Sequence, residues 1–476
     1  MVFSSLTFLF IFLPIVLIGN RLIPKKYVNV FLLLMSLIFY AWGEPKYIIL
    51  MVISIVVNWI FGCLMEDKPD YKKIILISDI VFNLVLLGYF KYFDFFIYTI
   101  NSIIKGDIPA KNIPLPIGIS FYTFQILSYV IDLYFEKYKA QRSIKDLALY
   151  ICLFPQLIAG PIVRYEDIYE QINNRECTAK MSADGIKRFI YGLGKKVIIA
   201  NTLAECLKDI FAINAESLSF SMAWIGFVIC MLNIYYDFSG YSDMAIGIGK
   251  MLGFEFVENF NYPYLSKSIT EYWRRWHISL NVWFREYLFM PFSRSKFLKF
   301  FRDKIKDKKK RRLFTPAACT LVVFAFTGLW HGASYGFIVW GIFHGILMII
   351  EQLGFSKFLE KHKIFGHIYT LLAVGIGLII FEDGLSRGIP YIKVLFTPWV
   401  KPSYDIYSIA EIVDNRTTIF IIIGIIGCGF FKPVFEKMKN IKYAEYYEII
   451  WCALLMLVSI TMLASGTYNP FIYFRF

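Results

Sequence analysis

Histidine is scarce in this sequence, and three of its five copies lie in or beside apolar runs: His277, His331 and His344. An ionisable residue in such a run is costly, so it marks a candidate functional site. His331 lies between Trp330 and Gly332, directly after an apolar run. Burial keeps an imidazole neutral, and a neutral imidazole can act as a general base toward a hydroxyl. A structural histidine that is hydrogen-bonded inside a helix bundle is the alternative.

His344 lies thirteen residues after His331. On one continuous helix this spacing would place the two side chains roughly 140° apart. We therefore expect a structural role for His344.

Residues 266–292 predict one long helix with two stripes of side chains. Large apolar side chains recur at helical spacing: Trp273, Trp276, Leu280, Trp283 and Tyr287. Polar side chains fall within about 80° of one another beside them: Arg274, His277, Asn281 and Arg285. The polar stripe suits an anionic acyl donor, or a substrate oriented around His277. An amphipathic helix at the membrane interface, with its cations on lipid headgroups, is the alternative.

Residues 237–243 carry Asp237, Ser239 and Asp243 next to apolar sequence. Polar groups at membrane depth need partners. They either bind a substrate hydroxyl or an ion, or they join a structural network with the Arg/His stripe. The structural network is the favoured interpretation, because buried polar networks are stable only when fully satisfied.

The elements that hold these residues belong to a membrane protein. The 476 residues are 58% hydrophobic and 18% charged, whereas a soluble chain usually carries about 25% charge. Apolar runs approach the length of about 20 residues that spans a bilayer, and they recur from end to end. We expect one transmembrane domain over residues 1–476, not a soluble enzyme with an anchor.

The net charge of +14 does not indicate nucleic-acid binding, because the basic residues gather in loops between apolar runs. The strongest cluster, residues 294–312, has eleven Lys or Arg against two Asp. We expect this segment to be cytoplasmic and to contact the lipid bilayer.

The apolar runs predict helices over 3–19, 28–42, 46–64, 74–104, 115–136, 145–160, 185–212, 219–250, 266–292, 314–330, 335–353, 366–382, 417–431 and 446–464. Prolines and a glycine interrupt residues 154–164. Such a break is tolerated at membrane depth where it is packed in protein or lines a wet cavity, so a re-entrant segment is expected there. A plain break between two spans is the alternative.

Eight scattered cysteines form no C-x-x-C pair, and neither a disulfide framework nor a metal site is expected. The sequence lacks a Walker phosphate loop, H-E-x-x-H and G-x-S-x-G. We therefore expect no bound cofactor and no recognised soluble-enzyme chemistry.

Four motifs in order, at residues 154–162, 237–243, 272–280 and 329–333, resemble the membrane-bound O-acyltransferase (MBOAT) family, closest to its alginate O-acetyltransferase branch. The resemblance implies an all-α ring of about 11–13 transmembrane and re-entrant helices around a central tunnel. The catalytic core would lie at about 115–353. His331 would be the catalytic residue and His277 the second active-site histidine. Residues 381–384 depart from the family pattern, so the resemblance does not extend to partner or acceptor contacts there, while the core chemistry is unaffected.

The resemblance also implies the reaction. An acetyl or similar short acyl group would move from a cytoplasmic thioester, usually acetyl-CoA, to a hydroxyl of an extracytoplasmic polysaccharide. The transfer often passes through an exported partner protein, in a multi-pass protein of the bacterial cytoplasmic membrane. Substrate-binding roles are predicted for Arg274, Asn281, Arg285, Trp330, Asp237, Ser239 and Asp243.

Two other functions stay open at this stage. One is D-alanyl transfer to teichoic acid, since those transferases share the central motifs. The other is a glycan or lipid transporter or scaffold without enzyme activity, because an aromatic content of 19% suits a glycan path. A chain rich in Ile, Phe, Lys and Tyr fits an AT-rich bacterial genome, which favours an acceptor other than alginate.

Overall fold

Long apolar runs become long helices throughout the part of the chain that the computed structural model describes, residues 1–400, 402, 408–433, 437 and 443–466. No strand occurs among these residues. Eight helical stretches in them are long and apolar enough to cross a membrane. The prediction of an all-α, multi-pass membrane protein is therefore confirmed. The ring around a central tunnel and the single domain over 1–476 stay predictions.

The eight stretches are made of the following helices: α2 (Lys25–Gly43), α3 (Ile48–Asp67), η2 (Pro69–Tyr71) with α4 (Lys72–Leu87), η3 (Gly88–Tyr92) and α5 (Phe93–Ile104), α12 (Phe220–Met251), α17 (Lys308–His331), α18 (Tyr335–Ile350) with η7 (Glu351–Phe355) and α19 (Ser356–Lys361), α20 (Lys363–Leu395), and α24 (Ala444–Ala464).

The chain divides into two compact units. Unit 1 comprises Met1–Phe189 and Tyr241–Glu258, and unit 2 comprises Ile190–Gly240 and Asn259–Phe476. The remaining helices of unit 1 are η1 (Phe8–Phe12), α1 (Leu13–Leu22), α6 (Ile119–Tyr134), α7 (Ile144–Cys152), α8 (Phe154–Leu157) and α9 (Tyr165–Asn174). Those of unit 2 are η4 (Lys195–Ala200), α11 (Asn201–Ala212), η5 (Pro263–Leu265), α13 (Ile269–Arg275), α14 (Ile278–Phe284), η6 (Arg285–Phe289), α15 (Met290–Ser293), α16 (Lys296–Asp303), α21 (Ile409–Ile412), α22 (Asn415–Ile425) and η8 (Ile426–Phe430). Residues of α10 (Ala179–Gly194) and α12 fall in both units.

The interrupted segment of unit 1 is buried along its whole length. Helices α7 and α8 have nine and four residues, and neither is long enough to span a bilayer. Residues 146–163 are all buried, including the non-helical stretch 158–163. A Cβ on Gly160 would lie 2.7 Å from the carbonyl oxygen of Pro155, so the chain turns back tightly there. These features agree with a re-entrant segment, which is tolerated because protein surrounds it.

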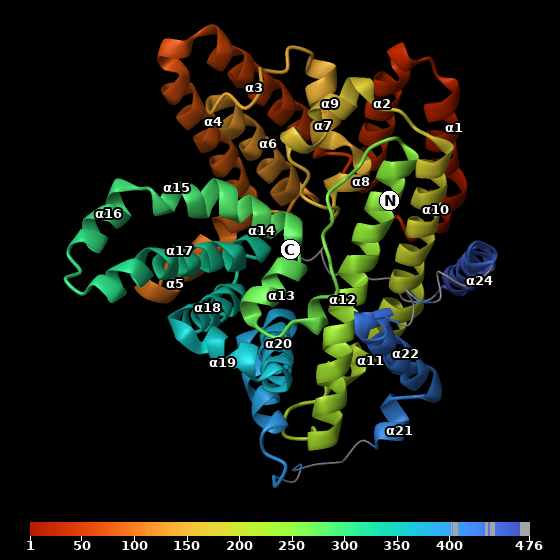
Figure 1. The fold of residues 1–476 in the computed structure, drawn as a ribbon, viewed down its shortest axis with the longest axis vertical. Helices are drawn as coiled ribbons and strands as arrows, with labels where there is room; N and C mark the ends of the chain where they lie inside the picture. The colour runs from red at the N-terminus through yellow and green to blue at the C-terminus, as the bar shows by residue number, and fades with distance from the viewer. Residues whose placement is uncertain (401, 403–407, 434–436, 438–442, 467–476) are drawn as a thin grey trace. The chain divides into compact units, whose positions relative to one another are not determined.

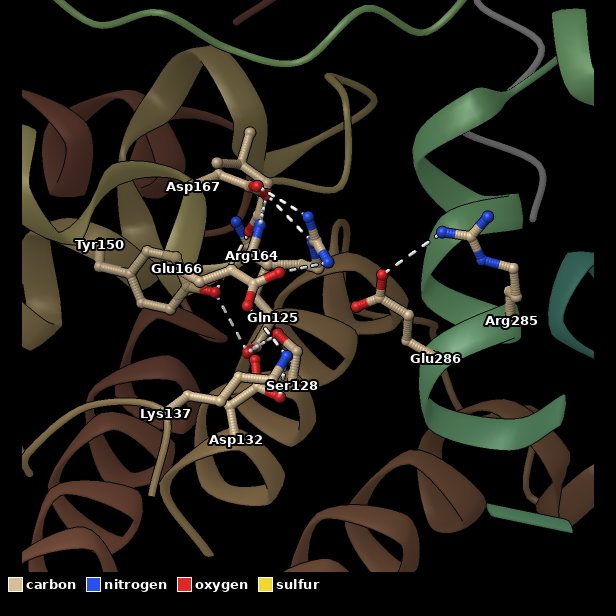
Figure 2. Close-up of polar contacts among 11 residues, drawn as sticks. Gln125, Ser128, Asp132, Lys137, Tyr150, Arg164, Glu166, Asp167, Arg285 and Glu286 are labelled. Atoms are coloured by element: carbon tan, nitrogen blue, oxygen red, sulfur yellow. Dashed lines mark hydrogen bonds and ion pairs between the residues drawn. The ribbon is translucent and has the colours of Figure 1, made fainter. Parts of the chain in front are cut away.

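A chain of ion pairs joins the end of α6 to the start of α9 in unit 1 (Figure 2). Lys137 lies 2.9 Å from both Asp132 and Glu166. Arg164 lies 2.8 Å from Asp167, whose carboxylate also accepts the backbone N–H of Arg164 at 2.9 Å. Because the Lys137 side chain is 40% exposed, the pairs add little stability each, and they mainly fix where α9 begins.

Glycines bring α17 and α18 of unit 2 into close contact, and the two helices lie side by side (Figure 1). A Cβ on Gly341 would lie 2.2 Å from the carbonyl oxygen of Phe324. A Cβ on Gly328 would lie 2.2 Å from the carbonyl oxygen of Phe337. Small residues at such interfaces let helix backbones approach each other in membranes. This contact fixes the end of α17, where His331 lies.

We expect Gly341→Ala to lower the free energy of unfolding by about 1–3 kcal/mol, because the added methyl must displace a backbone carbonyl. The measurement is the thermal denaturation midpoint of the detergent-purified protein. Gly88→Ala is the matched control, since a Cβ there meets nothing within 4 Å. Equal midpoints for the two variants would contradict the close approach of α17 and α18.

Candidate active site

The predicted continuous helix over residues 266–292 is wrong. Helix α13 ends at Arg275 and α14 begins at Ile278, with His277 between them in the left-handed region at φ 46° and ψ 53°. A residue other than glycine adopts this conformation at a cost of about 1–3 kcal/mol, so the surrounding structure must enforce it. The periodicity of the side chains gave no sign of the break.

Asn259 enforces the break through both its backbone and its side chain. Its carbonyl oxygen accepts the N–H of Ile278 at 3.0 Å. Its side-chain oxygen accepts from Ser279, at 3.3 Å from the backbone N–H and 2.9 Å from the hydroxyl. The two residues that follow His277 are therefore both held by one buried asparagine, whose side chain is fully inaccessible.

The same oxygen of Asn259 sets the tautomer of His277. His277 Nδ1 lies 3.1 Å from Asn259 Oδ1. Because this oxygen already accepts a backbone N–H from Ser279, it is an acceptor, and Nδ1 must carry the proton. The lone pair of the neutral ring is therefore on Nε2.

The break also separates the four residues of the predicted polar stripe. Asn281 bridges the break, donating to the carbonyls of Trp273 at 2.5 Å and Trp276 at 2.8 Å. Arg274 is exposed on α13, and the side chain of Arg285 is 66% exposed and 3.6 Å from Glu286 (Figure 2). The single stripe is thus wrong, because it needed one continuous helix. Substrate-binding roles for the individual residues stay predictions.

His331 is the last residue of α17 and is only 2% exposed. Aromatic rings surround its imidazole, with centroids at 5.0 Å for Trp330, 5.1 Å for Trp340 and 5.1 Å for Phe381. The ring of His277 lies 6.5 Å away, centroid to centroid. The fold therefore brings the two candidate histidines together inside unit 2.

A small cavity lies beside His331. Its lining residues are Ile234, Phe238, Trp276, His331, Trp340, Leu378 and Phe381. Its volume is about 10 Å³, which is close to the space that one water molecule needs. One face of the His331 ring therefore borders a gap rather than solid packing. Phe381, where the sequence departs from the family pattern, forms part of this wall.

His344 lies on α18, so it does not continue the helix of His331. Its Nδ1 accepts the indole N–H of Trp273 at 3.4 Å. A Cβ on Gly377 of α20 would lie 2.7 Å from its Nε2. His344 thus joins α13, α18 and α20, as expected for a structural histidine.

The two aspartates of residues 237–243 pair with basic side chains from outside the Arg/His stripe. Within unit 2, Asp237 lies 2.5 Å from Lys196, and both side chains are 3% exposed. Within unit 1, Asp243 lies 2.8 Å from Arg188. Ser239 is buried in α12. The predicted partners in the Arg/His stripe are therefore wrong for the two aspartates, although both do have ion-pair partners, and substrate binding by the three residues stays a prediction.

Sequence reasoning missed Lys196, Asn259 and Trp340. Lys196 could have been found from the sequence, since it is a charged residue directly before the apolar stretch 197–200. Asn259 and Trp340 could not, because their roles depend on contacts with residues distant in the sequence. Among the described residues, no group of three or more His, Cys, Asp or Glu could hold a metal ion.

Comparison with known proteins decides the family. The model of the MBOAT, membrane-bound O-acyltransferase family, matches residues 37–380, a stretch that includes both His277 and His331. The chain belongs to this family. It is therefore an O-acyltransferase of the MBOAT type and a multi-pass membrane protein.

Relatives in the MBOAT family have several acceptors in their names. The "probable alginate O-acetylase AlgI" of Pseudomonas putida is 34% identical over 100% of both chains. The peptidoglycan O-acetyltransferase of Helicobacter pylori is 36% identical over 74% of this chain and 70% of its own. The teichoic acid D-alanyltransferase of Bacillus subtilis is 30% identical over 54% of this chain and 63% of its own.

Burial lowers the pKa of His277, which lies outside the candidate spans, to about 3 from its usual 6.5. Below pH 6.5 the unfolded chain binds a proton at this residue and the folded protein does not. We therefore expect stability to fall between pH 6.5 and 3, by about 1.4 kcal/mol per pH unit, and to be constant above it. His277→Gln should reduce this slope in denaturation midpoints measured at pH 7.5, 6.5, 5.5 and 4.5. An unchanged slope would contradict a buried neutral His277.

We expect Lys196→Met to lower the free energy of unfolding by about 3–5 kcal/mol, because it leaves a buried carboxylate without its cation. The double variant Lys196→Met, Asp237→Asn should recover most of that loss in thermal denaturation. No recovery would argue against the pair. The acyl-transfer activity of the stable double variant then decides whether Asp237 also binds substrate. Wild-type activity in this variant, which lacks the Asp237 carboxylate, excludes that role.

Proposed function

We propose that this MBOAT protein moves an acetyl or similar short acyl group from a cytoplasmic thioester, acetyl-CoA, to a hydroxyl of an extracytoplasmic polysaccharide in the bacterial cytoplasmic membrane. The observation that carries the proposal is the pair of buried histidines, 6.5 Å apart, with His331 on the wall of a cavity. The names of the alginate and peptidoglycan relatives support a polysaccharide acceptor. An exported partner protein that passes the group on is part of the proposal.

His331 acts as the general base. It takes the proton of the acceptor hydroxyl while the oxygen attacks the thioester carbonyl carbon. The carbon–sulfur bond then breaks, and the leaving thiolate takes the proton from the imidazolium. The products are an ester and a free thiol, so no other co-substrate is needed. General-base help is worth about 10²–10⁴-fold, and holding both substrates together supplies more.

His277 and Arg274 position the donor or the acceptor. The rings of His277 and His331 are close enough for one bound group to touch both. Asn259 keeps the His277 ring in one tautomer, so its Nε2 offers a fixed acceptor for a hydroxyl proton. A fixed hydrogen-bonding partner of this kind orients a substrate without reorganising during the reaction.

The cavity beside His331 must widen before a substrate can enter. A space of about 10 Å³ lined by Trp340, Leu378 and Phe381 is too small for an acyl group of any length. Even an acetyl group needs some of these side chains to move, so substrate binding must open the cavity. Binding steps that rearrange side chains around a reacting group are common in enzymes that exclude water.

Transfer of D-alanine to teichoic acid is the second candidate, favoured by the Bacillus subtilis relative. That relative covers only about half of this chain, whereas the alginate relative covers all of it. Labelled acetyl-CoA and a labelled D-alanyl thioester, offered separately to purified protein, distinguish the two donors.

We expect His331→Ala to reduce acyl transfer from radiolabelled acetyl-CoA by at least about 10²-fold, because the base is lost. His362→Ala is the matched control, since it removes an exposed histidine. Full activity in a folded His331→Ala protein would remove His331 from the mechanism. Denaturation midpoints of both variants show whether they are folded.

A further inference from the structure

An open groove of about 360 Å³ lies inside unit 1, away from the histidines of unit 2. One wall is α1, which contributes Leu17, Ile18 and Leu22. The other wall is formed by Ile186 of α10 and Met251 of α12. Small-molecule sites usually measure about 300–1,000 Å³. The groove is therefore large enough to hold a ligand, and these wall residues are apolar.

Close helix packing on both sides keeps the groove from closing. A Cβ on Gly19 of α1 would lie 2.2 Å from Phe31 Cζ, so α1 packs tightly against α2 (Figure 1). A Cβ on Gly185 of α10 would lie 2.6 Å from the carbonyl oxygen of Gly247, so α10 packs tightly against α12. The first wall is thus fixed to α2, and the second wall is itself a tightly packed pair of helices.

A positioned positive charge lines the same groove. Arg21 lies in the last turn of α1, and its Nη2 donates to Ser182 Oγ of α10 at 2.5 Å. The hydroxyl is neutral, so this contact holds the guanidinium in place without neutralising its charge. A guanidinium has five N–H donors in a planar fork that matches the oxygens of a phosphate. Most of these donors remain for a ligand.

The segments that form the groove also carry an excess of positive charge. Lys25 and Lys26 begin α2, and Lys180 lies in the first turn of α10; all three are exposed. The sequence has no acidic residue over 16–26, and Asp184 is its single acidic residue over 178–186. Clusters of basic residues next to apolar helices attract anionic lipid headgroups. The charge therefore complements an anionic ligand.

We propose that this groove binds an anionic phospholipid, whose headgroup phosphate contacts Arg21 and whose acyl chain lies along the apolar walls. Arginine near the end of an apolar helix reaches the level of the lipid headgroups. A groove that is apolar along its walls and cationic at the end of α1 matches an amphiphile with a charged head. A free phosphate would leave the apolar walls unused, and an uncharged lipid would leave Arg21 unused.

A helix from a second copy of this chain is the competing occupant, since an apolar groove can also accept a helix. Such a helix would cover the apolar walls without requiring a phosphate at Arg21. The two occupants therefore differ in whether binding depends on the charge of the lipid headgroup.

Native mass spectrometry in a neutral detergent measures the affinity of the purified protein for phosphatidylglycerol and for phosphatidylcholine with the same acyl chains. We expect the wild type to bind phosphatidylglycerol about 10-fold more tightly, because charge-assisted hydrogen bonds add about that factor. Arg21→Gln should remove this preference by weakening the binding of phosphatidylglycerol alone. Lys68→Gln is the matched control, because it removes an exposed cation at the end of α3 and should leave the preference unchanged.

A pair of tryptophan variants on α1 tests the groove independently of Arg21. Ile18 and Ile15 are 58% and 50% exposed, and Ile18 is the one that lines the groove. We expect Ile18→Trp to fill the groove and weaken the binding of both lipids, whereas Ile15→Trp should change neither. Thermal denaturation midpoints show that the variants are folded. Added phosphatidylglycerol should raise the midpoint of the wild type more than that of Ile18→Trp.

Three results would overturn the proposal. Equal affinity of the wild type for the two lipids, or an unchanged preference in Arg21→Gln, would reject the headgroup contact. Unchanged lipid binding in Ile18→Trp would reject the groove as the site. A wild-type dimer that Ile18→Trp converts to a monomer would assign the groove to a second copy of the chain. None of these measurements uses acyl transfer, so failure of this proposal leaves the proposed function untouched.

Discussion

The side-chain oxygen of Asn259 is the contact on which the geometry of the histidine site depends. It accepts hydrogen bonds from Ser279 and from the ring of His277, at a point where the chain leaves one short helix and enters the next. A buried backbone break leaves polar groups that must find partners, since no water is available to satisfy them. By supplying those partners, Asn259 offsets the conformational free-energy cost of the left-handed backbone at His277. It also fixes which ring nitrogen holds the proton.

The second histidine is placed by backbone contact rather than by hydrogen bonds. Gly328 and Gly341 let α17 and α18 approach until a single added methyl would clash with a carbonyl. That approach brings Trp340 of α18 against His331 at the end of α17. In a membrane, where apolar side chains gain little by leaving lipid, such close packing is a main source of helix association. The cavity beside His331 is what the rings leave unfilled.

Two of the buried ionisable groups among the described residues each have a polar partner. Asp237 pairs with Lys196, and Lys91 lies against Ser120. Desolvating a charge costs several kcal/mol unless a partner or a neutral form offsets it. A chain that retains such residues in apolar surroundings gains either a fixed helix arrangement or a reactive group.

The sequence by itself determined the membrane class, the helical architecture and the family, and it singled out the two candidate histidines. Those conclusions rest on local properties, namely the length of apolar runs, the scarcity of histidine and short motifs in order. The interruption of residues 154–164 was also visible, because prolines and glycines act on their own neighbours, whereas the buried extent 146–163 came from the structure. The expected structural role of His344 agrees with its contact to Trp273, but the spacing argument behind it assumed one continuous helix, whereas His344 lies on α18.

Only the tertiary structure decided how the site is assembled. The continuous stripe over residues 266–292 failed because Asn259, which precedes the predicted helix in the sequence, accepts hydrogen bonds from the backbone of Ile278 and Ser279. The pairing of Asp237 with Lys196 and of Lys91 with Ser120 joins residues on different helices. Periodicity describes one helix at a time, whereas a buried polar group takes the partner that folding brings within hydrogen-bonding distance, and that distance is a property of the packed chain.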